Sequence, residues 1–529
     1  MGSVNPPIKD GWQAVVARKL AQQKDAIQAF ASSNTHTEEP LAGVTNISDV
    51  TELVRKYAEK SFTCEQVIKT YISTFTEIFF CDAIADAIQL DQYMAKEGKP
   101  KGPLHGVPIT LKDQFNVAGY DTTLGYTGRA FKPATDDAVL VKMLRSLGAV
   151  IIAKTNLPQS ILWVETENPL WGLTTNPMSS RYTPGGSTGG EAALLFMQGS
   201  MLGWGTDIGG SIRSPSHMMG LYGLKPSSSR LPYTGVPVST EGQEHVPSSI
   251  GPLARSLPTI VETMKALISL EPWALDCRCV PIPWREPIYK SVQEQKLTIG
   301  LLLDDGVVRP HPPIIRAIQD AASALEKLGH EIVPWTDDLH AECIEVMDMF
   351  YTADGGEDIR RDVEAGGEPF IPHVEKLVNR GSPISVYEYW QLNKRKKNLQ
   401  QAYLNKWNGT KSPTTQRTVD VIIMPTMPHA SVPHQTSRWV GYTKVWNFLD
   451  YTALTIPAGR VEMKDCDARW DHAARNDIDA WNAKVWADNK QEMAGLGLPV
   501  SVQIVGRNLE EEKVLAVGSI LDRVCQETR

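Results

Sequence analysis

The chain has 529 residues, of which 42% are hydrophobic and 22% charged, and these are ordinary proportions for a globular protein. Its formal net charge of −8 argues against a nucleic-acid-binding protein, which would present a basic surface. Residues 1–28 are polar, and no stretch approaches the roughly 18 apolar residues of a membrane span, so we expect a soluble cytoplasmic protein without a signal peptide.

Helical patterns occupy the first part of the chain. Residues 10–31 predict a polar helix, and residues 49–60 and 64–79 carry apolar side chains at helical spacing. These segments predict a helical N-terminal layer over residues 1–100.

From residue 102 onward, short apolar runs alternate with helical segments. The runs that predict buried strands are residues 107–111, 148–153, 297–303, 419–424 and 500–505. Helices are predicted at residues 137–147, 192–197, 313–328 and 510–525, and the charged segment 462–492 predicts a helical excursion on the surface. The alternation is typical of an α/β fold. We expect one domain over residues 1–529, with its core in residues 102–230 and 290–525.

The seven cysteines are odd in number and scattered along the chain, which indicates a reducing compartment rather than a disulfide framework. Cys277 and Cys279 form a C-x-C pair, but neither a second pair nor a histidine cluster accompanies them. The sequence therefore predicts no metal site.

Two glycine-rich runs carry the most informative residues. Residues 185–191 (GGSTGGE) contain Ser187, and residues 205–213 (GTDIGGSIR) contain Ser211, 24 positions later (211 − 187). Lys112 follows the apolar run at 107–111. A serine hydrolase that works without histidine uses two serines on flexible backbone and one lysine among apolar residues, and this sequence contains all three.

Amide hydrolysis requires an activated nucleophile and donors that stabilise the oxyanion of the tetrahedral intermediate. In the second run, backbone N–H groups are placed to serve as an oxyanion hole: those of Ile208, Gly209, Gly210 and Ser211. Burial of Lys112 would favour its neutral amine, which could act as the base, although Asp113 follows directly in the sequence.

A second interpretation uses different partners. Residues 185–189 fit the G-x-S-x-G pattern of a nucleophile elbow, which would make Ser187 the nucleophile and His429 or His434 its base. This alternative leaves the second glycine-rich run unexplained. A phosphate-binding loop is excluded because no Gly-Lys-Ser/Thr follows the glycines of residues 185–190. Either glycine-rich run, taken alone, could be a structural loop.

These motifs resemble those of the amidase signature family of serine hydrolases. The two glycine-rich runs and residues 223–226 (GLKP) match its central motif, and residues 102–108 (GPLHGVP) leading to Lys112 match its lysine motif. The resemblance covers about residues 50 to 525 and is strongest to the fungal acetamidase branch, through residues 271–273, 310–313 and 354–356. It implies one large domain with a mixed β-sheet core covered by helices on both faces.

The resemblance also implies a mechanism. Ser211 would be the nucleophile, Lys112 the base and Ser187 the relay between them, with a cis peptide bond at Gly186–Ser187. Thr188 stands where the family usually has a second serine, and its added methyl group would lie against the substrate. No cofactor or metal is implied, and the suggested assembly is a homodimer.

Other residues are expected to support this site. Asp207 and Arg213 flank Ser211, and we expect them to pair and hold the loop. Ile161, Leu162 and Trp163 align with a stretch that lines the acyl pocket in relatives, and ordinary core packing is the alternative for this stretch. Trp446 and Asn447 are expected to form another wall of the pocket. Apolar walls of this kind favour acyl groups without charge.

The resemblance suggests hydrolysis of a small aliphatic amide such as acetamide. An aryl amide, a lactam or a specialised metabolite amide is an alternative substrate. A non-catalytic subunit or an amidotransferase subunit is an alternative function, which the intact Ser211, Ser187 and Lys112 and the acidic charge balance disfavour.

Overall fold

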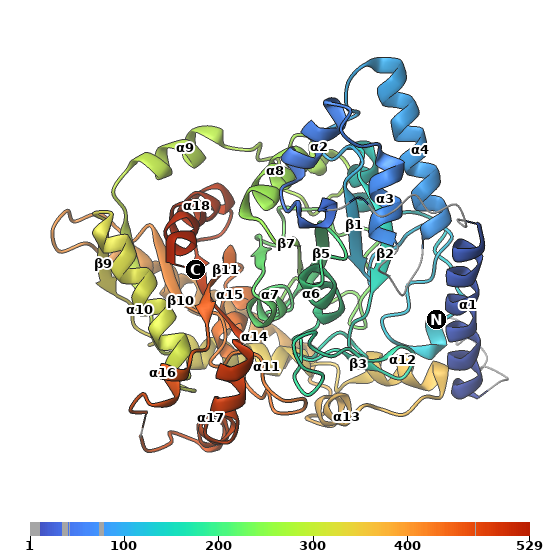
Figure 1. The fold of residues 1–529 in the computed structure, drawn as a ribbon. Helices are drawn as coiled ribbons and strands as arrows, with labels where there is room; N and C mark the ends of the chain where they lie inside the picture. Colours follow the sequence, from blue (N-terminus) through green and yellow to red (C-terminus); the bar gives the residue numbers. More distant parts are fainter. Residues whose placement is uncertain (1–10, 34–40, 42, 73–78, 471, 529) are drawn as a thin grey trace.

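The computed structural model describes residues 11–33, 41, 43–72, 79–470 and 472–528, and a ten-stranded sheet runs through its centre (Figure 1). The strands follow one another across the sheet in the order β2 (Val150–Thr155), β1 (Pro108–Lys112), β5 (Leu202–Asp207), β7 (Ser249–Ala254), β6 (Tyr222–Lys225), β11 (Ala453–Arg460), β12 (Pro499–Val505), β10 (Val421–Pro425), β8 (Thr298–Leu301) and β9 (Glu331–Pro334). A separate two-stranded sheet joins β3 (Glu167–Asn168) and β4 (Gly172–Leu173).

The sheet is parallel at both ends and antiparallel in the middle. Strands β2, β1 and β5 pair in parallel, as do β10, β8 and β9, whereas the pairs between β5 and β10 are antiparallel. This arrangement confirms the mixed α/β sheet that the resemblance implied.

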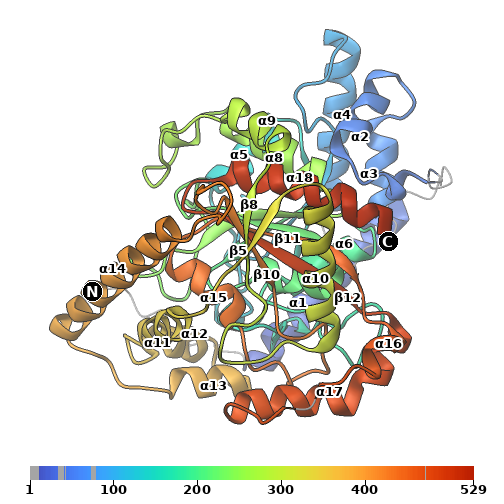
Figure 2. The same ribbon diagram turned by 90° about the vertical axis from the view of Figure 1, so that its left-hand side faces the viewer.

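Helices cover both faces of the sheet (Figures 1 and 2). Leu454 and Ile456 of β11 lie against Gly518 of α18, on the face that also packs against α8 and α10. The helices of this face are α8 (Leu257–Ile268), α10 (Pro312–Lys327) and α18 (Glu511–Thr528), with α9 (Glu286–Glu294) against α18. The opposite face carries α6 (Gly189–Phe196), α7 (Arg213–Met219), α11 (His340–Tyr351), α14 (Val386–Gly409) and α15 (Gly441–Phe448).

The remaining helices lie at the margins of the sheet. They are α1 (Trp12–Ser33), α2 (Val50–Ala58), α3 (Cys64–Ile72), α4 (Phe80–Glu97), α5 (Val139–Ser146), α12 (Glu357–Gly366), α13 (Pro372–Val378), α16 (Met463–Cys466) and α17 (Asp477–Leu496). Three 3-10 turns complete the described elements: Val44–Asn46, Thr127–Arg129 and Pro272–Ala274. No helix among the described residues combines the length and the apolar character needed to cross a membrane.

The long periodic segments match their predicted elements to within a few residues, and the five predicted strands correspond to β1, β2, β8, β10 and β12. Helix α4 was not predicted. The predicted helix at 64–79 corresponds to α3 over Cys64–Ile72, and residues 73–78 of that prediction lie outside the described residues. The predicted excursion at 462–492 contains α16 and most of α17.

Strand β7 corrects the predicted core boundaries. The sequence excluded residues 231–289 from the core, yet β7 pairs with both β5 and β6 in the middle of the sheet. Gly251 and Pro252 interrupt its apolar pattern, which is why no strand was predicted there. Glycine is required at 251 because an added Cβ would lie 2.0 Å from the carbonyl oxygen of Leu224.

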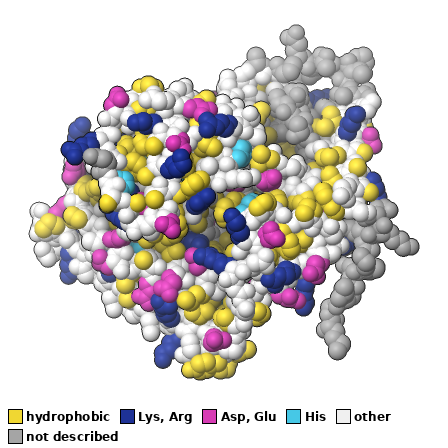
Figure 3. All heavy atoms as spheres, turned by 90° about the horizontal axis from the view of Figure 1, so that it is seen from below, with side chains coloured by type: hydrophobic (Ala, Val, Ile, Leu, Met, Phe, Trp, Pro, Cys, Tyr) yellow, Lys and Arg dark blue, Asp and Glu magenta, His cyan; other side chains and the backbone are white. Residues whose placement is uncertain are grey.

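Charged side chains of both signs are interspersed over the face seen in Figure 3, with no continuous basic area on it.

We predict that Gly251→Ala destabilises the protein by about 1–3 kcal/mol, because the new methyl group must displace the β6 backbone. Urea denaturation would measure the change. The matched control is Gly495→Ala in α17, where an added Cβ meets nothing within 4 Å and helix propensity favours alanine by about 1 kcal/mol. Equal midpoints for wild type and Gly251→Ala would contradict the prediction.

Candidate active site

The site forms where two parallel strands end side by side. Strands β1 and β5 pair in parallel, so their carboxyl ends lie at the same edge of the sheet. Lys112 is the last residue of β1 and Asp207 is the last residue of β5. Ser211 follows β5 in the turn that leads into α7. This edge is where α/β folds place ligands.

The amine of Lys112 is buried and held by hydroxyl groups. Its Nζ donates to Ser187 Oγ at 2.6 Å and to Thr206 Oγ1 at 3.1 Å, and the side chain is 0% exposed. Thr206 in turn donates to Gln114 Oε1 at 2.7 Å. Burial lowers the pKa of Lys112 to about 7, although the charge of Asp207 acts in the opposite direction. The amine is therefore substantially neutral near neutral pH.

The carboxylate of Asp113 does not compete for that amine. It accepts hydrogen bonds from the backbone N–H groups of Thr123 at 2.9 Å and Leu124 at 3.0 Å. It also forms an ion pair with Lys154 at 3.2 Å. Since side chains alternate along a strand, Asp113 is directed away from its neighbour Lys112.

The two glycine-rich runs meet at their serines. The peptide bond Gly186–Ser187 is cis, as the resemblance implied. The backbone N–H of Thr188 donates to the carbonyl oxygen of Ser211 at 3.2 Å, which joins the two runs directly. Ser187, Ser211 and Lys112 are therefore brought together, although they are far apart in the sequence.

Asp207 organises the turn that carries Ser211. Its carboxylate pairs with Arg213, with Arg213 Nε at 3.0 Å and Nη2 at 2.9 Å, and both side chains are fully buried. It also accepts from the N–H of Ile212 at 3.1 Å and from Asn447 Nδ2 at 2.9 Å. Burial alone would raise the pKa of Asp207, but the Arg213 guanidinium and these donors hold it well below its usual range. The predicted Asp207–Arg213 pair is confirmed.

The same carboxylate corrects the predicted set of oxyanion donors. The N–H of Gly210 donates to Asp207 Oδ1 at 2.7 Å, so this group is already engaged. Within the described residues, the N–H groups of Ile208, Gly209 and Ser211 have no acceptor. The hydroxyl of Tyr351 donates to the Ile208 carbonyl oxygen at 3.0 Å and so orients the peptide that carries the Gly209 N–H.

The histidines of the second interpretation do not reach Ser187. His429 Nδ1 lies 2.8 Å from the Ala430 carbonyl oxygen, and His429 Nε2 lies 3.2 Å from Ser437 Oγ. His434 Nδ1 lies 3.3 Å from Glu165 Oε2. The nucleophile-elbow interpretation therefore lacks its base in this fold.

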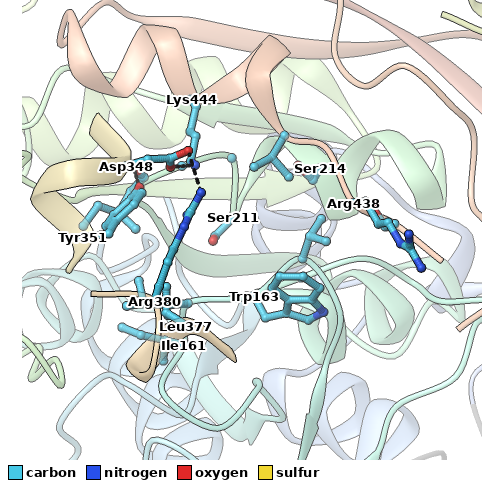
Figure 4. A pocket seen from close by; sticks show the side chains of 18 residues that line it. Ile161, Trp163, Ser211, Ser214, Asp348, Tyr351, Leu377, Arg380, Arg438 and Lys444 are labelled. Carbon is cyan, nitrogen blue, oxygen red and sulfur yellow. Dashed lines mark hydrogen bonds and ion pairs between the residues drawn. The ribbon is translucent and has the colours of Figure 1, made fainter. Parts of the chain in front are cut away.

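Ser211 lies on the wall of a cavity (Figure 4). Ile161, Leu162 and Trp163 line it, as the sequence analysis proposed for an acyl pocket. Leu377 and Val440 add further apolar surface. A second cavity borders both Ser187 and Ser211 and is lined by polar residues that include Tyr233, Ser248 and Arg278. Ser211 lines both cavities, whereas Ser187 lines the second one.

Two expected substrate residues do not line this cavity. Trp446 is 0% exposed and packs among the aromatic side chains of the core, where its Nε1 lies 3.2 Å from Met424 Sδ. Thr188 is also 0% exposed and faces Gly205, where an added Cβ would lie 2.7 Å from the Thr188 methyl carbon. Both side chains point into the packed interior, so we place them in the core rather than at the substrate.

The cavity also has a charged side that the sequence analysis missed. Asp348, Arg380, Arg438 and Lys444 all line it. These residues belong to separate segments and no local motif contains them, so no sequence signal could have grouped them. The predicted apolar wall residues therefore share the cavity with charged side chains.

No group of three or more His, Cys, Asp or Glu side chains that could hold a metal ion occurs within the described part of the chain. Cys279 is buried and Cys277 is exposed.

Known proteins resemble this chain over nearly its whole length. The family model described as Amidase matches residues 52–515. Amidase 1 of Gibberella moniliformis is 51% identical over 518 residues, which cover 96% of this chain and 98% of that protein. The acetamidase of Emericella nidulans is 37% identical over 536 residues, which cover 98% of this chain and 96% of that protein. A solved structure of a fatty acid amide hydrolase has a TM-score of 0.83 at 28% identity, covering 99% of this chain and 92% of that one.

We predict that Arg213→Met destabilises the protein by about 3–5 kcal/mol, because it leaves the buried Asp207 carboxylate without its cation. Chemical denaturation would measure the loss. Arg361→Met is the matched control, since Arg361 pairs with Glu357 on the surface of α12 and its removal should change stability by about 0.5 kcal/mol or less. Similar changes in both variants would contradict a structural role for the buried pair.

Proposed function

The chain belongs to the amidase signature family and is an amidase, and we propose that it hydrolyses small aliphatic amides, such as acetamide, through Ser211, Ser187 and Lys112. The observation that carries this proposal is the 2.6 Å hydrogen bond between the buried Lys112 amine and Ser187. A neutral amine in contact with a serine hydroxyl can remove a proton from it without histidine.

The first half of the reaction forms an acyl-enzyme. Neutral Lys112 accepts the proton of Ser187 while Ser187 accepts the proton of Ser211. The Ser211 oxygen attacks the amide carbonyl carbon, and the resulting oxyanion accepts hydrogen bonds from backbone N–H groups of residues 208, 209 and 211. The C–N bond then breaks as Ser187 passes a proton to the nitrogen and recovers one from Lys112. Ammonia leaves, and an ester at Ser211 remains.

The second half repeats the relay with water. Ser187 and Lys112 take a proton from a water molecule, which attacks the ester carbonyl, and Ser211 leaves with a proton returned through Ser187. The products are a carboxylic acid and ammonia, which become a carboxylate and ammonium on proton transfer in water, with one water consumed. The polar cavity beside Ser187 and Ser211 provides a path for ammonia and water, while the acyl group occupies the apolar cavity.

Acetamide is the reference substrate because two relatives, at 37% and 38% identity, are named acetamidases. Aryl amides, lactams and specialised metabolite amides remain alternatives for the same relay. The presence of all three side chains and the contact of Lys112 with Ser187 support a catalytic function over a non-catalytic subunit. We further propose that the enzyme is a cytoplasmic homodimer that requires neither metal nor cofactor.

We predict that Ser211→Ala lowers kcat on the order of 10⁴- to 10⁶-fold, because the nucleophile is removed while the fold persists. Ser187→Ala and Lys112→Met should each lower it by roughly 10²- to 10⁴-fold, since they interrupt proton transfer. Ammonia release from acetamide and hexanamide would measure all three.

Matched controls are Ser269→Ala and Lys290→Met, which make the same chemical changes at the end of α8 and on the surface of α9. Substantial turnover by purified Ser211→Ala would exclude Ser211 as the nucleophile. Full activity of Lys112→Met would exclude lysine as the base.

We also predict a specific pH profile. Protonated Lys112 cannot accept a proton, so kcat/KM should fall about tenfold per pH unit below the Lys112 pKa of about 7 and should level off above it. Initial rates between pH 5.5 and 9, with circular dichroism at each pH to verify folding, would test this. A flat profile across that range would be incompatible with a lysine base.

A further inference from the structure

The substrate cavity carries more positive than negative charge. Among its lining residues, Arg380, Arg438 and Lys444 are cationic and Asp348 is the one carboxylate, an excess of two positive charges (three minus one). These side chains come from α11, from the segment after α13, and from α15 with the residues before it. An acyl pocket that selected only uncharged acyl groups would not need these charged side chains.

The single carboxylate is engaged mainly by lysine. Lys444 forms a close ion pair with Asp348 Oδ1. Arg380 Nη2 lies 3.6 Å from Asp348 Oδ2, which is beyond hydrogen-bonding distance. In the described part of the chain, the Arg380 guanidinium has no other acidic partner. Arg380 therefore keeps donors available for a further anion.

The two arginines of the cavity differ in direction. Figure 4 shows the Arg380 side chain extending along the cavity toward Asp348, to which a dashed line joins it, with Arg438 directed away on the far side of Trp163. The Arg438 guanidinium lies 3.5 Å from the centre of the Trp481 ring, which holds it against α17. Of the two arginines, Arg380 is thus the one that a substrate bound in the cavity would contact.

The charged side of the cavity adjoins the backbone that would hold the oxyanion. A Cβ added at Gly209 would lie 3.0 Å from the Tyr351 hydroxyl and 3.6 Å from Lys444 Cγ. Lys444 and its partner Asp348 therefore lie next to the residues that activate the amide. Ile161 and Leu377 line the same cavity as Ser211 and these charged side chains.

From this geometry we propose that the preferred substrates are monoamides of dicarboxylic acids, whose free carboxylate binds Arg380. The inference rests on the proposed amide hydrolysis and specifies its substrate class. The planar guanidinium offers paired donors that match a carboxylate, and the apolar walls accommodate the intervening methylene groups. Asp348 and Lys444 are positioning residues that hold the charged side in place.

The test compares amides of equal length with and without the carboxylate. Succinamate, glutaramate and adipamate are paired with butanamide, pentanamide and hexanamide, and kcat/KM is measured for each. Wild type should favour the anionic member of at least one pair by roughly tenfold, and Arg380→Gln should abolish that preference. Arg438→Gln, which removes the same charge from the same cavity, should keep the wild-type ratio.

A binding measurement separates this inference from the proposed function. Calorimetry with the Ser211→Ala variant, and with that variant carrying Arg380→Gln, would compare the same pairs without turnover. The inference is supported if Ser211→Ala binds the anionic amide more tightly than the neutral one and the added Arg380→Gln removes this difference. This result would support it even if no hydrolysis occurred. Hydrolysis without any preference for the anion, no difference in binding, or equal losses in Arg380→Gln and Arg438→Gln would each overturn the inference and leave amide hydrolysis standing.

Discussion

A buried amine whose hydrogen-bond partners are two hydroxyl oxygens is poorly solvated as a cation, and the geometry at the end of β1 imposes this condition on Lys112. A carboxylate placed directly against that amine would restore its charge and remove its capacity to accept a proton. The fold avoids this by directing Asp113, the next residue, toward Thr123, Leu124 and Lys154. The proposed base therefore depends on Asp113 being engaged by these other partners.

Asp207 is the nearest charge that could undo this arrangement, and its pairing with Arg213 has two consequences. The pair fixes the turn from β5 into α7, because the same carboxylate binds the N–H groups of Gly210 and Ile212. It also balances a buried negative charge that would otherwise stabilise protonated Lys112. One ion pair thus shapes the backbone around Ser211 and limits the electrostatic field at the amine. Because the Gly210 N–H donates to Asp207, the oxyanion would accept hydrogen bonds from the N–H groups of neighbouring residues instead.

The sequence predicted those parts of the fold and site that are encoded locally. The long apolar runs of β1, β2 and β12 and the glycine-rich runs around Ser187 and Ser211 each carry their own signal. Strand β7 was missed because Gly251 and Pro252 break its pattern, and these residues fit only because β5 and β6 lie on either side. Trp446 was misplaced for a related reason, since its aromatic partners come from α14 and the segment after α15.

The charged side of the cavity could not be predicted from the sequence. Its position has a consequence for substrate specificity. Ser187, Ser211 and Lys112 lie in segments linked to strands β1 and β5, whereas Asp348, Arg380 and Lys444 belong to α11, the segment after α13, and α15. Substitutions in those segments change the charge of the cavity wall at positions outside the strands that hold the reactive groups. Reaction chemistry and acyl selection are therefore separable in this fold, and relatives that share the glycine-rich runs need not share a substrate.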